Sequence, residues 1–204
     1  KAIQMKPDFV ESKIGLATIS LKKHEYSKAR QLLTSALRLS PTSIAAYLSL
    51  SDLYIREYQY TSAIDILRQL VESNESNGRA RGLLARAYLR SGQIEEAKHQ
   101  LESKTKHKPD GVSDTAFLSL VAAEVAIADG HVDNAELSLT RLSAPFKNGV
   151  MPDDLLLDWI ALRSVQSDDL AVENLVRSAK KRGIPKDEIE AARRVVALRS
   201  PTHE

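Results

Sequence analysis

A short pattern that ends in alanine recurs along this 204-residue chain, and its spacing limits the possible folds more than any other feature. Each copy has a bulky apolar residue in its third place and alanine in its sixth; the copies are residues 24–29, 58–63, 92–97 and 130–135. Successive alanines are 34, 34 and 38 residues apart. A period of this length is typical of an array of stacked helical units.

The residues around each copy repeat as well. A small residue lies 12 positions before each alanine: Ala17, Ser51, Ala85 and Ala123. A leucine lies four positions after each alanine: Leu33, Leu67, Leu101 and Leu139. Residues three, four and seven apart share one face of a helix. These offsets therefore predict pairs of helices joined by short turns, in which the alanine lets the two backbones approach closely.

The composition agrees with an all-α fold. Apolar residues make up 43% of the chain and aromatic residues 5%. Leucine and alanine dominate the apolar set, and both favour helices. A single helical hairpin cannot cover its own apolar faces, so several must stack and the last must be capped. We therefore predict an array of stacked antiparallel hairpins with a C-terminal capping helix.

Together these residues resemble the tetratricopeptide repeat family over about residues 10–143. That family has a small residue in the first helix, an aromatic nearby, a turn that often contains glycine, an alanine in the second helix and a closing proline. The third copy shows all five: Ala85, Tyr88, Gly92, Ala97 and Pro109. The resemblance implies a right-handed α-solenoid. It also implies that the first helices line a concave groove that holds a segment of a partner.

The resemblance divides the chain into two regions. Residues 1–143 are expected to hold four repeats, and residues 150–204 a degenerate fifth hairpin followed by the capping helix. The repeats are expected at about 10–43, 44–77, 78–111 and 116–149, the last including its trailing loop. The expected helices are 10–22, 26–39, 44–56, 60–73, 78–90, 94–105, 114–129, 132–143, 153–166, 169–182 and 186–199.

Two stretches depart from the pattern. The polar run at residues 103–108 predicts that the preceding helix ends early, and we place the extra residues of the longer period between Pro109 and Ala116. Two prolines and a glycine within residues 143–153 predict a loop. Beyond that loop Ala171 would take the place of the repeated alanine, and Trp159 would stand where earlier copies have a small residue.

No motif of an active site is present in the sequence. It has no glycine-rich phosphate loop, no HExxH and no GxSxG, and its five histidines are scattered singly. We expect no catalytic residue, no cofactor and no bound metal, and the absence of cysteine excludes thiolate ligands. The acidic pairs at residues 153–154 and 168–169 stand just before helices, and we interpret them as capping residues.

Partner-binding residues are expected on the first helices, where hairpin contacts leave side chains free. They are Ile14, Thr18, Leu21, Lys22, Leu48, Asp52, Ile55, Arg56, Arg79, Arg86, Leu89, Arg90 and Leu120. Four of them form a basic row: Lys22, Arg56, Arg86 and Arg90. With the apolar members beside it, this row suits a protein segment that has apolar anchors and acidic residues. The family's lysine and asparagine clamp for a terminal carboxylate is not matched, since Thr18, Leu48 and Gly82 occupy its places.

The function predicted first is a non-catalytic protein-interaction scaffold, and the resemblance extends to arrays in bacterial envelope and secretion assemblies. A regulatory or targeting domain of a larger enzyme is the alternative. An RNA-binding helical repeat is a third reading, which the net charge of +2 disfavours. Self-association through the open ends of the array is a further expectation.

No apolar run approaches the roughly 18 residues of a membrane helix, so no span is expected in this segment. The chain begins with Lys1, from which we expect it to be part of a longer protein. Its compartment, bacterial periplasm or cytoplasm, stays open.

Overall fold

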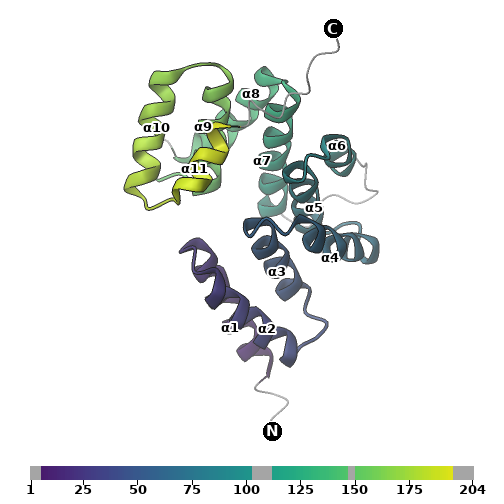
Figure 1. Ribbon diagram of the computed structural model, residues 1–204. Coiled ribbons are helices and arrows are strands. Elements are labelled where there is room, and N and C mark those ends of the chain that lie inside the picture. The colour runs from purple at the N-terminus through teal and green to yellow at the C-terminus, as the bar shows by residue number, and fades with distance from the viewer. Residues whose placement is uncertain (1–5, 103–111, 147–149, 195–204) are drawn as a thin grey trace.

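The computed structural model describes residues 6–102, 112–146 and 150–194, and these residues form helices joined by short turns, with no strand among them (Figure 1). The helices are α1 (Lys6–Lys22), α2 (Tyr26–Leu39), α3 (Ile44–Arg56), α4 (Tyr60–Ser73), α5 (Gly78–Arg90), α6 (Ile94–Glu102), α7 (Val112–Asp129), α8 (Val132–Ser143), the 3-10 turn η1 (Ala144–Phe146), α9 (Asp153–Val165), α10 (Asp169–Lys181) and α11 (Lys186–Arg193). Among the described helices, none is long and apolar enough to cross a membrane.

The helix bounds follow the sequence pattern closely. Helices α2, α3, α4, α5 and α8 begin and end at the expected residues, and α9 and α10 differ by one residue at one end. Helix α1 begins four residues earlier than expected and α7 two residues earlier. Helix α11 ends at Arg193, six residues earlier than expected, with Arg194 as its C-cap. The expected early end of α6 at 103–108 lies outside the described residues. The division into four repeats and a C-terminal region stays a prediction.

The helices form two layers of a right-handed α-solenoid. Each odd-numbered helix from α1 to α7 packs against the next odd-numbered helix as well as against its own hairpin partner. The odd helices therefore form the inner layer, which Figure 1 shows running through the array, and the even helices lie outside it. The repeated alanines Ala29, Ala63, Ala97 and Ala135 are fully buried, as a close contact between the helices of each hairpin requires.

All five hairpins turn the same corner. One residue of each corner has a left-handed backbone, with φ between 58° and 86°: His24, Tyr58, Gly92, Gly130 and Ser167. The next N–H then donates to the carbonyl five residues back, as Gln93 does to Tyr88 at 2.9 Å and Asp168 to Arg163 at 3.0 Å. This pair of features is a common way to end a helix. The fifth hairpin is thus built like the others.

The shared corner corrects the expected register of the fifth hairpin. In the first four hairpins the buried alanine follows the left-handed residue by five positions, and five positions after Ser167 is Val172. Val172 is buried, whereas Ala171 is half-buried. The position 12 residues before Val172, where the other hairpins have a small residue, is held by Ile160 and not by Trp159. Ile160 is fully buried. A larger pair, Ile160 and Val172, thus fills the place that alanine and a small residue fill elsewhere.

The left-handed conformation at Ser167 gives a stability prediction. A side chain costs about 1–2 kcal/mol in this conformation, and glycine avoids most of that cost while adding entropy to the unfolded chain. Ser167→Gly is therefore expected to raise the free energy of unfolding by about 0.5–1 kcal/mol. Ser178→Gly, at an exposed site inside α10, should lower it by a similar amount. Urea denaturation of both variants checks the pair, and equal signs would contradict the corner assignment.

Candidate functional site

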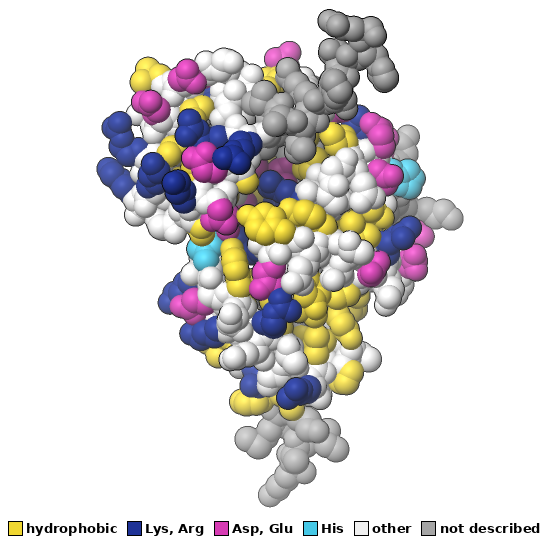
Figure 2. Space-filling view, viewed as in Figure 1, with side chains coloured by type: hydrophobic (Ala, Val, Ile, Leu, Met, Phe, Trp, Pro, Cys, Tyr) yellow, Lys and Arg dark blue, Asp and Glu magenta, His cyan; other side chains and the backbone are white. Residues whose placement is uncertain are grey.

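A cavity opens on the inner side of the array, between its middle and the C-terminal helices. It encloses about 1110 Å³, counting the solvent at its mouth. Residues of α3, α5, α7, α9 and α11 line it, together with Tyr58 at the corner before α4 and Tyr60, the first residue of α4. Figure 2 shows the surface hollowed at this place, with charged side chains inside the recess. Its apolar walls include Leu89, Ile127 and Leu157.

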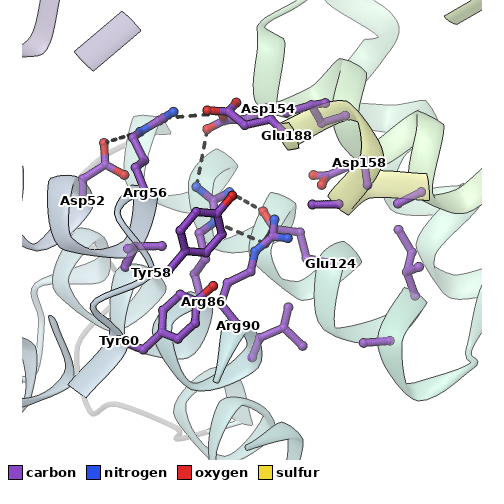
Figure 3. Close-up of a pocket in the computed structure, with 18 residues that line it drawn as sticks. Asp52, Arg56, Tyr58, Tyr60, Arg86, Arg90, Glu124, Asp154, Asp158 and Glu188 are labelled. Carbon is purple, nitrogen blue, oxygen red and sulfur yellow. Dashed lines mark hydrogen bonds and ion pairs between the residues drawn. The ribbon is translucent and has the colours of Figure 1, made fainter. Parts of the chain in front are cut away.

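Three arginines on α3 and α5 face carboxylates of the same chain (Figure 3). Arg56 lies 3.4 Å from Asp52 on its own helix. Arg86 donates from Nε to Glu124 of α7 at 3.2 Å, and a second of its nitrogens also bonds that carboxylate. Arg90 lies 3.7 Å from the same Glu124. Arg86 and Glu124 are both buried, so their charges stabilise each other where water is excluded.

Asp154 joins the cluster from α9, and this corrects the capping interpretation of the first acidic pair. Its carboxylate lies 3.7 Å from Arg56 and 3.4 Å from Arg86 (Figure 3). Burial would raise the pKa of Asp154, but Arg86 and Arg56 outweigh burial and hold the pKa below its ordinary value. The N-cap residue of α9 is Pro152, and both acids lie in the first turn of the helix, so neither occupies the capping position. In the second pair Asp168 does cap, since it accepts from the N–H of Ala171 at 3.1 Å, as expected.

Asp158 is a second buried acidic residue of the cluster, beside Glu124. Its side chain lines the cavity and points into it from α9, and the residue is only 5% exposed (Figure 3). Among the described residues, nothing makes a hydrogen bond to its Oδ2 atom. Burial raises the pKa of Asp158 well above its ordinary value, and the nearby Glu124 raises it further, against the opposite effect of Arg86 and Arg90. A buried polar atom without a partner is costly to stability.

This cost gives a pH-dependent prediction. An acid whose pKa is raised in the folded state contributes stability at low pH and loses that contribution as the pH rises through the folded pKa. Asp158→Asn removes the titration, so at pH 7 it should raise the free energy of unfolding by about 1–3 kcal/mol. At about pH 2–3, well below the ordinary aspartate pKa of about 3.9, Asp158 is protonated in both states and the difference should vanish. Denaturant titrations at several pH values check this, and a variant less stable than wild type at pH 7 would contradict it.

Phe117 of α7 fixes the position of α5 beside the cavity. Its ring lies against Gly82, where an added Cβ would come within 2.7 Å of the ring. The guanidinium of Arg79 lies 3.8 Å from the ring centre and that of Arg86 lies 4.9 Å from it. These contacts are cation–π interactions. The missing side chain at Gly82 therefore serves helix packing in this structure.

Helix α11 reaches across the inner side to the first two hairpins. Glu188 accepts from the hydroxyl of Tyr26 at 2.9 Å and lies 3.1 Å from Nδ1 of His24. The hydroxyl of Tyr58 donates to Asp187 at 3.3 Å. Burial and the bond to Glu188 raise the pKa of Tyr26. Figure 1 shows α11 between α9 and the end of α1, so it borders the cavity on the side of the first hairpins.

The structure brings together six of the thirteen predicted binding residues. Those that line the cavity are Asp52, Ile55, Arg56, Arg86, Leu89 and Arg90. The others lie elsewhere: Ile14, Thr18, Leu21, Lys22, Leu48, Arg79 and Leu120. Of the apolar members, Leu21, Ile55 and Leu89 are buried, which corrects the expectation that the hairpin contacts leave their side chains free. The reason is that each inner helix also packs against the next inner helix, and that contact covers a second face.

Several cavity residues were absent from the predicted set. Tyr58 and Tyr60 lie at a corner, and Asp154, Asp158 and Glu188 belong to the C-terminal region, where the repeat pattern is weak. A signal for Asp158 does exist in the sequence. It stands inside the stretch Leu155–Leu162, where its neighbours are otherwise almost all apolar, and an acid at such a position is unusual.

Among the described residues, no group of three or more histidine or acidic side chains could hold a metal ion. The cavity is thus lined by Asp158, whose buried Oδ2 makes no hydrogen bond to a described residue, by three arginines paired with carboxylates, and by apolar side chains. Mostly apolar walls with a few placed polar groups are typical of a binding site.

Comparison with known proteins identifies relatives of the repeat pattern. A family model described as "Tetratricopeptide repeat" matches residues 20–75 and 54–124, which together span just over half of the 204 residues. No curated protein matches the sequence.

Solved structures of similar fold cover nearly the whole chain. A tetratricopeptide repeat protein from Parabacteroides merdae is 14% identical, with a TM-score of 0.58, over 95% of this chain and 86% of that chain. PilW, described as a widely conserved type IV pilus biogenesis factor, is 15% identical, with a TM-score of 0.51, over 89% of this chain and 97% of that chain. At such low identities these similarities are evidence for the fold and for nothing more specific.

Proposed function

The chain belongs to the tetratricopeptide repeat family, and from this premise we propose that it is a non-catalytic scaffold that binds a segment of a partner protein on its concave side. The observation that carries the proposal is the cavity, which lies where the inner helices of successive hairpins face the C-terminal helices. Its apolar walls and aromatic mouth can hold side chains of an extended or helical segment.

The mouth of the cavity supports a protein partner. Tyr58 is 58% exposed and its ring meets that of Tyr60 edge to face, with ring centres 6.3 Å apart. Exposed tyrosines beside a recess are typical anchors of protein interfaces, since they offer apolar area together with a hydroxyl group.

The structure weakens the argument from the basic row that the partner segment is acidic. Arg56, Arg86 and Arg90 each face a carboxylate of the chain itself. An acidic ligand would have to displace these internal partners. Lys22, the fourth member, is exposed but does not line the cavity. We therefore rest the proposal on the cavity and its tyrosines.

A display selection tests the proposal. Random 12-residue peptides on phage are selected for binding to the immobilised chain, and the enriched peptides are synthesised with a fluorophore. We expect Tyr58→Ala to weaken their binding by about fivefold or more. The matched control is Phe9→Ala, since Phe9 is an aromatic of similar exposure (56%) that does not line the cavity. Failure to enrich any peptide, or equal binding to the wild type and Tyr58→Ala, would refute the proposed function.

A further inference from the structure

The charges that line the cavity do not cancel. Three arginines and five acidic residues contribute side chains to it. Asp52 and Asp154 contact Arg56, Glu124 contacts Arg86 and Arg90, and Glu188 contacts Tyr26 and His24. Asp158 remains, with one carboxylate oxygen that makes no hydrogen bond to any described residue. In its ionised form Asp158 therefore lacks a hydrogen-bond donor, and a positively charged donor suits the excess of acidic groups.

The surroundings of Asp158 also limit the shape of the missing group. The cavity that Asp158 lines also has apolar walls, which include Leu157, Ala161 and Ala192. Such walls can cover a chain of methylene groups while a charged end reaches the carboxylate, as buried lysine and arginine stems do in proteins. The tyrosines at the mouth can hold the neighbouring part of the same ligand.

We propose that Asp158 is the recognition site for a lysine or arginine side chain, which a partner segment inserts into the cavity past Tyr58 and Tyr60. The inference rests on the proposed function and adds the chemistry of the partner to it. The partner segment then carries a basic residue with apolar neighbours. An inserted cation supplies the hydrogen bond that Asp158 lacks and offsets the repulsion between Asp158 and Glu124.

Binding of this kind is coupled to protons. Asp158 faces Glu124 on α7, Arg86 and Arg90 on α5 and Asp154 on α9, and Glu188 of α11 and Arg56 of α3 line the same cavity. Because the raised pKa favours protonated Asp158 in the free chain, a cation that pairs with the ionised form releases a proton on binding. The affinity should therefore fall as the pH is lowered. Asp158→Asn should remove this part of the pH dependence.

The test uses the enriched phage peptides. We expect them to share a lysine or arginine at one position beside an apolar residue. Replacing that residue by norleucine, which keeps the stem and removes the charge, should weaken binding about ten- to a hundredfold. Asp158→Asn should cause a loss of the same size for the unmodified peptide and no further loss for the norleucine peptide. The control Asp65→Asn, at an exposed site on α4, should change nothing.

Three results would overturn the inference. In the first, enriched peptides depend on Tyr58 yet share no basic residue and bind Asp158→Asn as well as wild type; the proposed function then stands without the inference. In the second, the losses of affinity caused by the norleucine peptide and by Asp158→Asn are additive, which would mean that the basic side chain of the peptide does not contact Asp158. In the third, lysine amide competes as strongly as the peptides, which would make the site one for small amines. Since Asp158→Asn is expected to be at least as stable as wild type at pH 7, loss of folding does not confuse the readout.

Discussion

Arg86→Met should lower the free energy of unfolding by about 3–5 kcal/mol, the largest effect expected from a single change in this chain. Arg86 is buried and bonds both Glu124 and Asp154. Methionine fills a similar volume but leaves the buried Glu124 carboxylate without its main partner, next to the acidic Asp158. The cost is that of an uncompensated charge in a place from which water is excluded.

Controls separate this cost from the loss of any arginine. Arg177→Met, at an exposed site on α10, should change the stability by less than about 0.5 kcal/mol. Glu124→Gln removes the stranded charge, so adding it to Arg86→Met should restore part of the loss. Urea denaturation of the wild type, Arg86→Met, Glu124→Gln and the double variant measures this double-mutant cycle. A loss below about 1 kcal/mol for Arg86→Met would contradict a buried, stabilising ion pair.

The second large effect is a pair of glycine replacements with opposite signs. Gly82→Ala would bring a Cβ within 2.7 Å of the Phe117 ring, which is buried and lies beneath Arg79 and Arg86. Overpacking of this kind costs about 1–3 kcal/mol, which exceeds the gain in helix propensity. We therefore expect a net loss of about 1–2 kcal/mol.

Gly15→Ala supplies the matched comparison. Gly15 also lies inside a helix, α1, but an added Cβ there meets no atom within 4 Å. The only expected effect is the higher helix propensity of alanine, so this change should raise the free energy of unfolding by about 0.5–1 kcal/mol. Thermal unfolding of both variants shows whether each one is stabilised or destabilised relative to the wild type. A stabilised Gly82→Ala would show that Phe117 can move without cost, contrary to the close packing described above.

The sequence predicted the fold well because the repeat fixes local contacts. A buried alanine in each of the first four hairpins and a common corner set the hairpin geometry, and these contacts lie within about 20 residues of each other. The fifth hairpin shows where such reasoning stops. Its corner is conventional, but Val172 and Ile160 replace the small residues, so the alanine pattern pointed to Ala171, one residue too early.

The site was only partly predictable because its charges come from distant segments. The arginines on α3 and α5 are visible in the sequence as a basic row, but nothing in the repeat shows that Asp154 of α9 lies between Arg56 and Arg86. Similarly, the contact of Tyr26 with Glu188 joins residues 162 positions apart. A repeat pattern describes how neighbours stack, and it contains no information about how far the array curves back on itself.

The central claim is that a partner segment binds in the cavity between the inner helices and the C-terminal helices. Amide NMR spectra of the 22.6-kDa chain, recorded while an enriched peptide is added, test it most directly. We expect the shifted signals to gather at cavity residues of α5, α7 and α9, such as Leu89, Ile127 and Ala161. Shifts that gather instead on α2, α6, α8 and α10, which contribute no residue to the cavity lining, would contradict the claim.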